Sequence, residues 1–350
     1  MSEPEDQPAT GADNEKEMVI TPGGPRPKDN VHPVGPGQAV RRNQDGSYSV
    51  VRETPPSDGE KEESKVMAEE YVLTPGGYRL KSLVHPIETG HTLDGTGGRM
   101  RSMDAHGKLV AELGEIPVKP GDQPLMPHNV LAVNPAQAHV AGAKVPALKS
   151  GWITYADWTN STGKPITSFK TTWAVPPNPA THHNQTIFLF NGIQNSTMIY
   201  QPVLQWGPSA AGGGAYWAVA SWYADGQSGH SYHSGLTKVK VGQILVGVMT
   251  ETGKTGSNFN YDCIFQGIPG SNLPITNVQQ LTWCIETLEA YSCQVCSDYP
   301  AGKTKMYAIE IKTSGHPTLH WTAVNAVTDC SQHTIIVSNA NPGGEVDLYY

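Results

Sequence analysis

The chain has 350 residues, a net charge of −8 and a charged fraction of 16%, below the ~25% usual for soluble proteins. No massed basic residues supply the positive stripe that follows a phosphate backbone, so no nucleic-acid partner is expected. No apolar run approaches the ~18 residues that span a membrane as a helix, so no membrane partner is expected either. The length alone permits one large domain or two ordinary ones.

The charges are distributed unevenly and divide the chain near residue 150. Residues 1–150 hold 21 acidic and 16 basic residues, whereas residues 151–350 hold 11 and 8 and contain no arginine. All eight Trp, all five Phe and all five Cys lie after residue 150. Because such side chains build protein cores, the main folded domain is predicted to be residues 151–350.

The first residues and the cysteines bear on the compartment. The first 30 residues are acidic and rich in Pro and Gly, without the basic and apolar stretches of a secretory signal. The chain is therefore expected to be cytoplasmic or non-classically secreted.

Five cysteines are too few, and odd in number, for a disulfide scaffold, so free thiols are predicted. Cys293 and Cys296 form one C-x-x-C, for which a redox or metal pair is the less favoured alternative. No metal and no cofactor is predicted.

The N-terminal part contains an internal repeat. Residues 17–34, EMVITPGGPRPKDNVHPV, return at residues 70–87 as EYVLTPGGYRLKSLVHPI, with 11 of 18 positions identical. Each copy joins a short β-type run to a Thr-Pro-Gly-Gly turn and a Val-His-Pro step that does not favour a helix. We predict a disordered acidic tail at 1–65, a second repeat segment able to form a small hairpin at 66–115, and a Pro/Ala-rich linker at 116–150. A docking or pro-segment-like role and a tolerated duplication are equally good interpretations.

Residues 151–350 are predicted to be all-β. Short runs rich in Thr, Val, Ile and aromatic residues recur there between Gly, Pro, Asn and Ser, and no long amphipathic helix pattern is present. This pattern is typical of an antiparallel sandwich or barrel. The predicted strands cover residues 152–158, 166–175, 186–190, 198–205, 216–223, 237–241, 244–250, 258–265, 278–286, 305–312, 334–337 and 345–350.

Two glutamates stand out because this part of the chain has few carboxylates. Glu286 and Glu289 lie in one apolar run, 281–291, and strand alternation places them on opposite faces of a sheet. A carboxyl group in apolar surroundings has a raised pKa, which suits a general acid or base. The alternative is a structural carboxylate or an edge position that faces water. At most one of the two is expected to act chemically.

Two glutamines share a face of another strand. In the run 198–206, alternation places Gln201, Val203 and Gln205 on one side. An amide can position a water and stabilise a developing oxyanion without titrating. The alternative is a polar outer face of the sandwich. The signatures of zinc peptidases, serine hydrolases and P-loop proteins are absent from the sequence.

The order of several segments carries more information than any one of them. These are SFKTTWAVPPNP (168–179), FLFNGIQN (188–195), MIYQPVLQWG (198–207), YWAVASWYADG (216–226), LTKVKVGQILVGVMT (236–250) and LTWCIETLEAY (281–291). Their order and spacing resemble those of the glutamic peptidases of the eqolisin type. The resemblance covers about residues 150–312 and none of the repeats.

The resemblance implies a concanavalin-like β-sandwich and an acid-active endopeptidase-like hydrolase whose Glu/Gln pair activates water against a peptide bond. The family's catalytic glutamine falls on Gln201, with Gln205 as a second match. Its catalytic glutamate falls on Glu286 or Glu289, of which Glu286 is slightly favoured. The glutamate would act as general base and then return the proton to the leaving amine.

The resemblance also implies that Trp173, Trp217 and Trp222 line the substrate cleft. The chain departs from the family pattern at Gln194, which stands in place of an Asp. It departs again at Pro202, which in a strand predicts an edge or a bulge.

Two other functions stay open from the sequence. One is a non-catalytic sandwich that binds a carbohydrate or another protein on an aromatic platform. The other keeps the glutamate for proton transfer on a small molecule. A polypeptide or a glycan is thus the expected partner.

Overall fold

The computed structural model describes residues 71–116, 151–226 and 228–350, together with the backbone of four strands between residues 18 and 52. Most of residues 1–65, for which disorder is predicted, and nearly all of the predicted linker lie outside the described residues. The chain divides into two units, Met1–Val66 and Met67–Tyr350. The first unit holds two antiparallel pairs, β1 (Met18–Thr21) with β2 (Gly24–Pro27) and β3 (Gln38–Arg42) with β4 (Tyr48–Arg52).

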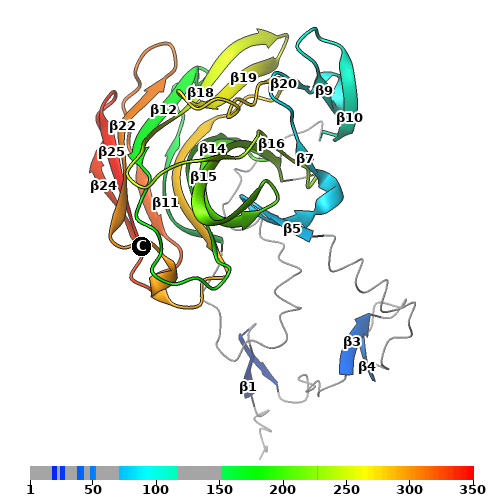
Figure 1. Ribbon diagram of the computed structural model, residues 1–350, viewed down its shortest axis with the longest axis vertical. Helices are drawn as coiled ribbons and strands as arrows, with labels where there is room; N and C mark the ends of the chain where they lie inside the picture. Colours follow the sequence, from blue (N-terminus) through cyan, green and yellow to red (C-terminus); the bar gives the residue numbers. More distant parts are fainter. Residues whose placement is uncertain are drawn as a thin grey trace, which may run out of the picture. The chain divides into compact units, whose positions relative to one another are not determined.

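The second unit is a β-sandwich of two large, mostly antiparallel sheets, which confirms the predicted all-β class. In Figure 1 the ten-stranded sheet curves around the outside of the nine-stranded sheet. The ten-stranded sheet runs in the order β10 (Leu109–Glu115), β9 (Arg99–Met103), β8 (Thr92–Asp94), β20 (Ile275–Val278), β19 (Asn258–Phe265), β18 (Ile244–Thr255), β12 (Ser168–Ala174), β22 (Lys303–Lys312), β25 (Gly344–Tyr349), β24 (His333–Ser338). The nine-stranded sheet runs β23 (Thr322–Asn325), β11 (Gly151–Thr159), β21 (Trp283–Tyr291), β13 (Thr186–Gln194), β14 (Met198–Ser209), β15 (Gly212–Asp225), β16 (Ser231–His233), β7 (Val84–Pro86), with β17 (Thr237–Lys238) beside β15.

Helical structure among the described residues is confined to three short 3-10 turns, Lys81–Leu83, Thr96–Gly98 and Cys296–Asp298. No helix in these parts of the chain is long and apolar enough to cross a membrane.

The central strands of the nine-stranded sheet are buried on both faces. β13 and β21 have almost no exposed position, whereas β12 in the other sheet alternates between buried and partly exposed residues. One face packs on the ten-stranded sheet, and Leu189 and Tyr200 belong with Phe169 to one shared apolar core. A second apolar cluster, which includes Phe188 and Trp222, covers the opposite face. Burial on both sides explains why these strands read as continuous apolar runs.

The second TPGG repeat belongs to this unit. β5 (Tyr71–Thr74) and β6 (Gly77–Leu80) form an antiparallel hairpin, and β7 pairs in parallel with β16. The strands β8 to β10 extend the ten-stranded sheet. Gly76 and Gly77 have φ values of 91° and 110°. Because side chains with a Cβ avoid this region, the Gly-Gly pair is what permits the tight turn.

Pro202 lies inside a central strand, which corrects the prediction of an edge or a bulge. It pairs with Ser221 of β15. On the other side, the β13–β14 ladder has no paired residues at Asn191 and Gly192 and then resumes in the same register. The missing N–H therefore interrupts one ladder locally without shifting the strand.

Candidate functional site

Glu286 and Glu289 lie on opposite faces of β21. Glu286 points between the two sheets, where its Oε1 accepts a hydrogen bond from Thr171 Oγ1 of β12 at 2.5 Å. Its side chain is fully buried. Burial raises the pKa of this carboxyl well above its ordinary value, and the Thr171 bond offsets this only in part. Glu286 is therefore sealed inside the sandwich, where burial favours its protonated form, and it does not share a face with Gln201.

Glu289 points away from the ten-stranded sheet. It is paired with Phe188 of β13, which is paired in turn with Gln205 of β14. Because directly paired residues point to the same side of a sheet, all three lie on the face covered by the second apolar cluster. We call this face of the nine-stranded sheet the Glu289 face.

The Glu289 carboxylate is buried and accepts two hydrogen bonds. Its Oε1 accepts the backbone N–H of Gly76 at 2.8 Å and the Tyr291 hydroxyl at 2.6 Å. Burial raises the pKa of Glu289 to about 7, while these two bonds and the nearby Arg79 charge oppose the rise. Glu289 therefore gains and loses its proton near neutral pH, and a general base is most effective when its pKa lies near the working pH.

Gln201 and Gln205 both lie on the Glu289 face, as alternation predicts. A Cβ added to Gly192 would lie 3.5 Å from the Gln201 Cβ and 3.2 Å from Ile285, which places Gln201 beside residues of this face. Gln205 stands in the same row as Glu289, two strands away, or about 10 Å between backbones. Gln201 lies a further four residues, about 13 Å, along β14. The structure thus brings Gln205 nearer to Glu289 than Gln201.

The two amides differ in their hydrogen bonds. Gln205 Nε2 donates to the carbonyl oxygens of Gly207 and Gly212, both at 3.0 Å, and its Oε1 accepts the Ser209 hydroxyl at 2.9 Å. Gln205 therefore holds the β14–β15 turn. By contrast, Gln201 Oε1 is buried and has no partner among the described residues.

Other polar atoms on the Glu289 face also lack partners. Thr287 lies two residues from Glu289 on the same strand, and Trp222 is paired with Gln201. The Thr287 hydroxyl and the Trp222 Nε1 are buried without a hydrogen-bond partner in the described parts of the chain. Because such atoms are costly to leave unpaired, this face has unused capacity to bind both donors and acceptors.

Trp173 and Trp217 do not line this face, which corrects the expectation for both. Each is buried in the core between the sheets, because its position in the strand alternation points inward. Trp222 alone of the three predicted tryptophans belongs to the apolar cluster of the Glu289 face.

The β5–β6 hairpin covers part of the Glu289 face. The Leu73 carbonyl accepts the Ala210 N–H at 2.7 Å. Arg79 Nη1 donates to the Asp225 carbonyl at 3.0 Å, and burial lowers the pKa of this guanidinium to about 10. The Tyr78 ring meets the Tyr291 ring edge-on, with centroids 6.0 Å apart. A polypeptide hairpin thus lies directly over the candidate base.

The chain beyond the hairpin is held by a histidine cluster. Ile87 donates its N–H to the His233 carbonyl at 2.8 Å, at the end of the β7–β16 pair. His85 Nε2 and His230 Nδ1 are 3.0 Å apart, and their rings stack. Burial, followed by the neighbouring His230 and His233, lowers the pKa of His85 to about 4. These rings are therefore neutral at neutral pH.

A cavity of about 230 Å³ lies beside the hairpin. It does not include Glu289. Its lining residues come from the hairpin and from the neighbouring strand ends and loops: Val72, Leu73, Tyr78, Asn184, Thr186, Pro208, Ser209 and Ser292.

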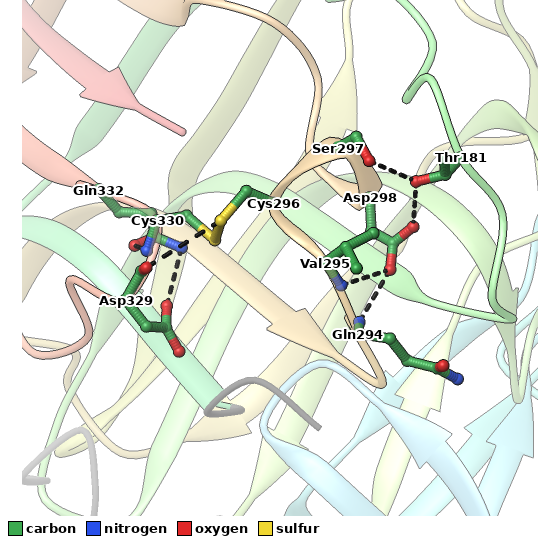
Figure 2. The surroundings of a disulfide bond; sticks show 9 residues. All are labelled: Thr181, Gln294, Val295, Cys296, Ser297, Asp298, Asp329, Cys330 and Gln332. Atoms are coloured by element: carbon green, nitrogen blue, oxygen red, sulfur yellow. Dashed lines mark hydrogen bonds between the residues drawn. A yellow bond between two sulfur atoms is a disulfide. The ribbon is translucent and has the colours of Figure 1, made fainter. Parts of the chain in front are cut away.

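Cys296 and Cys330 form a disulfide (Figure 2). This corrects the prediction of free thiols for Cys296 and Cys330, and it rules out the less favoured alternative of a Cys293–Cys296 pair. Cys263, Cys284 and Cys293 are free and buried. The spacing of Cys296 and Cys330 gave no signal, because residues far apart in sequence meet only in the folded chain.

The loop that carries Cys296 is organised by Asp298. As Figure 2 shows, Asp298 Oδ2 accepts the N–H groups of Gln294 at 2.8 Å and Val295 at 3.2 Å. Its Oδ1 accepts the Thr181 hydroxyl at 2.5 Å. His183 Nδ1 lies 2.8 Å from the same oxygen. Asp298 is thus committed to structure. No group of three or more His, Cys, Asp or Glu able to hold a metal ion occurs in the described part of the chain.

Sequence reasoning missed three residues that contact the site. Alternation already places Tyr291 on the same face as Glu289, but nothing in the sequence indicated that its hydroxyl bonds the carboxylate. Gly76 and Arg79 lie in the repeat, and both are identical in the two copies. That identity was the available signal.

Comparisons with known proteins give a distant likeness only. No family model matches the chain, and no curated protein matches its sequence. Among solved structures, scytalido-glutamic peptidase with a transition state analog inhibitor is 13% identical, with a TM-score of 0.37, over 57% of this chain and 98% of its own. SCP-B, a member of the Eqolisin family of peptidases in complex with the tripeptide Ala-Ile-His, is 13% identical with a TM-score of 0.35, over 58% and 99%.

Proposed function

We propose that the Glu289 face binds a polypeptide and that the chain is a peptide hydrolase with Glu289 as general base. One observation carries this proposal: a backbone N–H, that of Gly76, donates to Glu289 Oε1 at 2.8 Å. A polypeptide therefore already lies against a carboxylate whose pKa is raised to about 7. The unpartnered polar atoms of Gln201, Thr287 and Trp222 would pair with further backbone groups of a bound chain.

The chemistry follows from the position of Glu289. Ionised Glu289 takes a proton from a water whose oxygen attacks the scissile carbonyl carbon. The Tyr291 hydroxyl, and the Gln205 amide once it leaves the β14–β15 turn, are the donors available to the oxyanion. Collapse of the tetrahedral intermediate breaks the C–N bond. Glu289 then returns the proton to the leaving nitrogen.

The hairpin sets the expected pH dependence. Beneath the hairpin, Glu289 is ionised only above about pH 7, where its pKa lies. If the hairpin is displaced, water reaches the carboxylate and its pKa falls toward the ~4.3 of a free glutamate. Acid activity is therefore expected of the uncovered face. Arg79→Ala removes the bond to Asp225 and also the charge that lowers the pKa of Glu289. Exposure of the carboxylate should outweigh the lost charge, so the lower limb of the kcat/KM profile should shift to lower pH.

Cleavage of denatured casein between about pH 3 and 8 tests the proposal. We expect peptide release by Arg79→Ala, less by the wild type, and a loss of about 10²- to 10⁴-fold when Glu289→Gln is added. Cleavage that survives Glu289→Gln in a folded protein would rule out this base.

A non-catalytic polypeptide-binding module is the second candidate. The observation that favours it is that both hydrogens and the oxygen of the Gln205 amide are used inside the β14–β15 turn. In that case the Arg79→Ala protein retains polypeptide on a denatured-casein surface but releases no fragments at any pH.

A further inference from the structure

The segment that covers the Glu289 face occurs twice in the sequence. In the second copy, three features contact the sandwich: the Gly76 N–H bonds Glu289, Arg79 bonds the Asp225 carbonyl, and β7 pairs with β16. These contacts spread over residues 71–87. They bind the segment mainly through its backbone, one arginine and the Val-His-Pro strand.

The first copy retains these groups. Gly23 corresponds to Gly76 and Arg26 to Arg79, and the Val-His-Pro of β7 recurs at residues 31–33. Because the bonds of Gly76 and of β7 are backbone bonds, they need only the same backbone path in the first copy. These five positions are among the 11 that are identical in the two copies, so the first copy keeps the groups that bind the Glu289 face.

The differences between the copies spare most contacts. Ile20 stands for Leu73 and keeps an apolar side chain for the apolar cluster. Pro25 stands for Tyr78, so the ring contact with Tyr291 is lost. The first copy is therefore expected to bind the same face more weakly than the second.

The backbone of the first copy forms the same hairpin. In β1–β2, Thr21 pairs with Gly24, and in β5–β6, Thr74 pairs with Gly77. The two strands of the first copy are thus paired in the same register as those of the hairpin that covers the Glu289 face.

We propose that residues 17–34 are a second docking segment for the Glu289 face and that they bind this face on a second copy of the chain. In the molecule that accepts this segment, which we call the receptor, the resident 70–87 segment competes for the same face. Its effective concentration is in the ~mM range because it belongs to the same chain. A segment from another molecule therefore binds where the resident segment has been loosened. This docking goes beyond hydrolysis and does not depend on it.

Association between two full-length variants tests the proposal. The receptor is Arg26→Ala/Arg79→Ala, in which the resident segment is loosened and the first copy is disabled. The donor is the wild-type chain, and its matched control is Arg26→Ala. In sedimentation velocity we expect a receptor–donor complex that a synthetic peptide of residues 17–34 displaces, and a Kd about tenfold higher for the control donor.

Two results would overturn the proposal: no complex, or equal binding by the wild-type and Arg26→Ala donors. Circular dichroism establishes that the receptor is folded. If Arg79→Ala prevents folding, Arg26→Ala/Tyr78→Ala replaces it, because Tyr78 is partly exposed and its loss removes the ring contact with Tyr291 and packing at the edge of the apolar cluster. With that receptor too, no complex, or equal binding by the two donors, would overturn the proposal.

Discussion

Glu286 and Glu289 are three positions apart on β21, so their side chains lie on opposite faces of the sheet and meet different partners. Glu286 bonds Thr171 across the sandwich, whereas Glu289 bonds the backbone of the covering hairpin. Burial raises the pKa of both. Only Glu289 contacts a polypeptide segment, and its pKa of about 7 also suits a general base, so geometry and pKa both favour Glu289 over Glu286.

Glu286→Gln should change how stability depends on pH. Because the folded pKa is raised above the unfolded value, the stabilisation from protonated Glu286 is complete below about pH 4.3 and is lost as pH rises toward the folded pKa. The neutral amide has no such dependence. Urea unfolding between pH 5 and 7 should therefore show the variant gaining about 1 kcal/mol per pH unit relative to the wild type. Parallel pH dependences would contradict a buried, neutral Glu286.

Alternation along single strands predicted part of the site. It separated Glu286 from Glu289 and placed Gln201 with Gln205. It could not say which face points inward, because β13, β14 and β21 are apolar on both sides. The same ambiguity misplaced Trp173 and Trp217 in the expected cleft.

At the scale of elements, the β5–β6 hairpin covers part of the Glu289 face, and β7 follows it in the chain. We expect the histidines at the β7–β16 junction to make the stability of that junction depend on pH. The folded pKa of His85 is lowered to about 4, and burial also lowers those of His230 and His233. Lowered values mean that the stability of this junction is complete above about pH 6.5 and is lost as pH falls toward 4.

Hydrogen exchange at the Ile87 amide measures this loss. We expect exchange relative to the chemical rate to accelerate between about pH 6.5 and 4, as β7 separates from β16. His85→Phe keeps a stacking ring without a titrating group and should flatten the dependence. An unchanged dependence in this variant would exclude His85 as its source.

The disulfide is the second element-scale feature, and it joins the Asp298 loop to the loop at Cys330. Its sequence separation is 34 residues. A closed loop of that size restricts the unfolded chain by about 3–4 kcal/mol. The double change Cys296→Ser/Cys330→Ser should lower the free energy of unfolding by that amount in urea. A change below about 1 kcal/mol would show that the crosslink adds little.

Strand prediction succeeded where runs were long and failed where pairing partners are distant. The runs predicted at 258–265 and 305–312 match β19 and most of β22. The three-residue strands β7 and β16 were missed because neither is long enough to show a period. Their parallel pairing joins residues as far apart in sequence as Val84 and Ser231, which no local pattern reveals.

For the whole molecule, the composition break near residue 150 did not mark the edge of the folded unit. Residues 71–116 are poor in aromatic side chains, yet they add strands to both sheets and cover the Glu289 face. They are integrated mainly by backbone pairing, which composition does not record. The charged part of the sequence therefore contributes the cover of the candidate site.

The most direct test of the account compares two single changes on the Arg79→Ala background. The rate of casein cleavage at about pH 5 is measured for Glu289→Gln and for Glu286→Gln, each shown to be folded. The account predicts a loss of at least about 100-fold for Glu289→Gln and a rate within about threefold of the background for Glu286→Gln. Equal effects of the two changes, or a larger loss with Glu286→Gln, would contradict it.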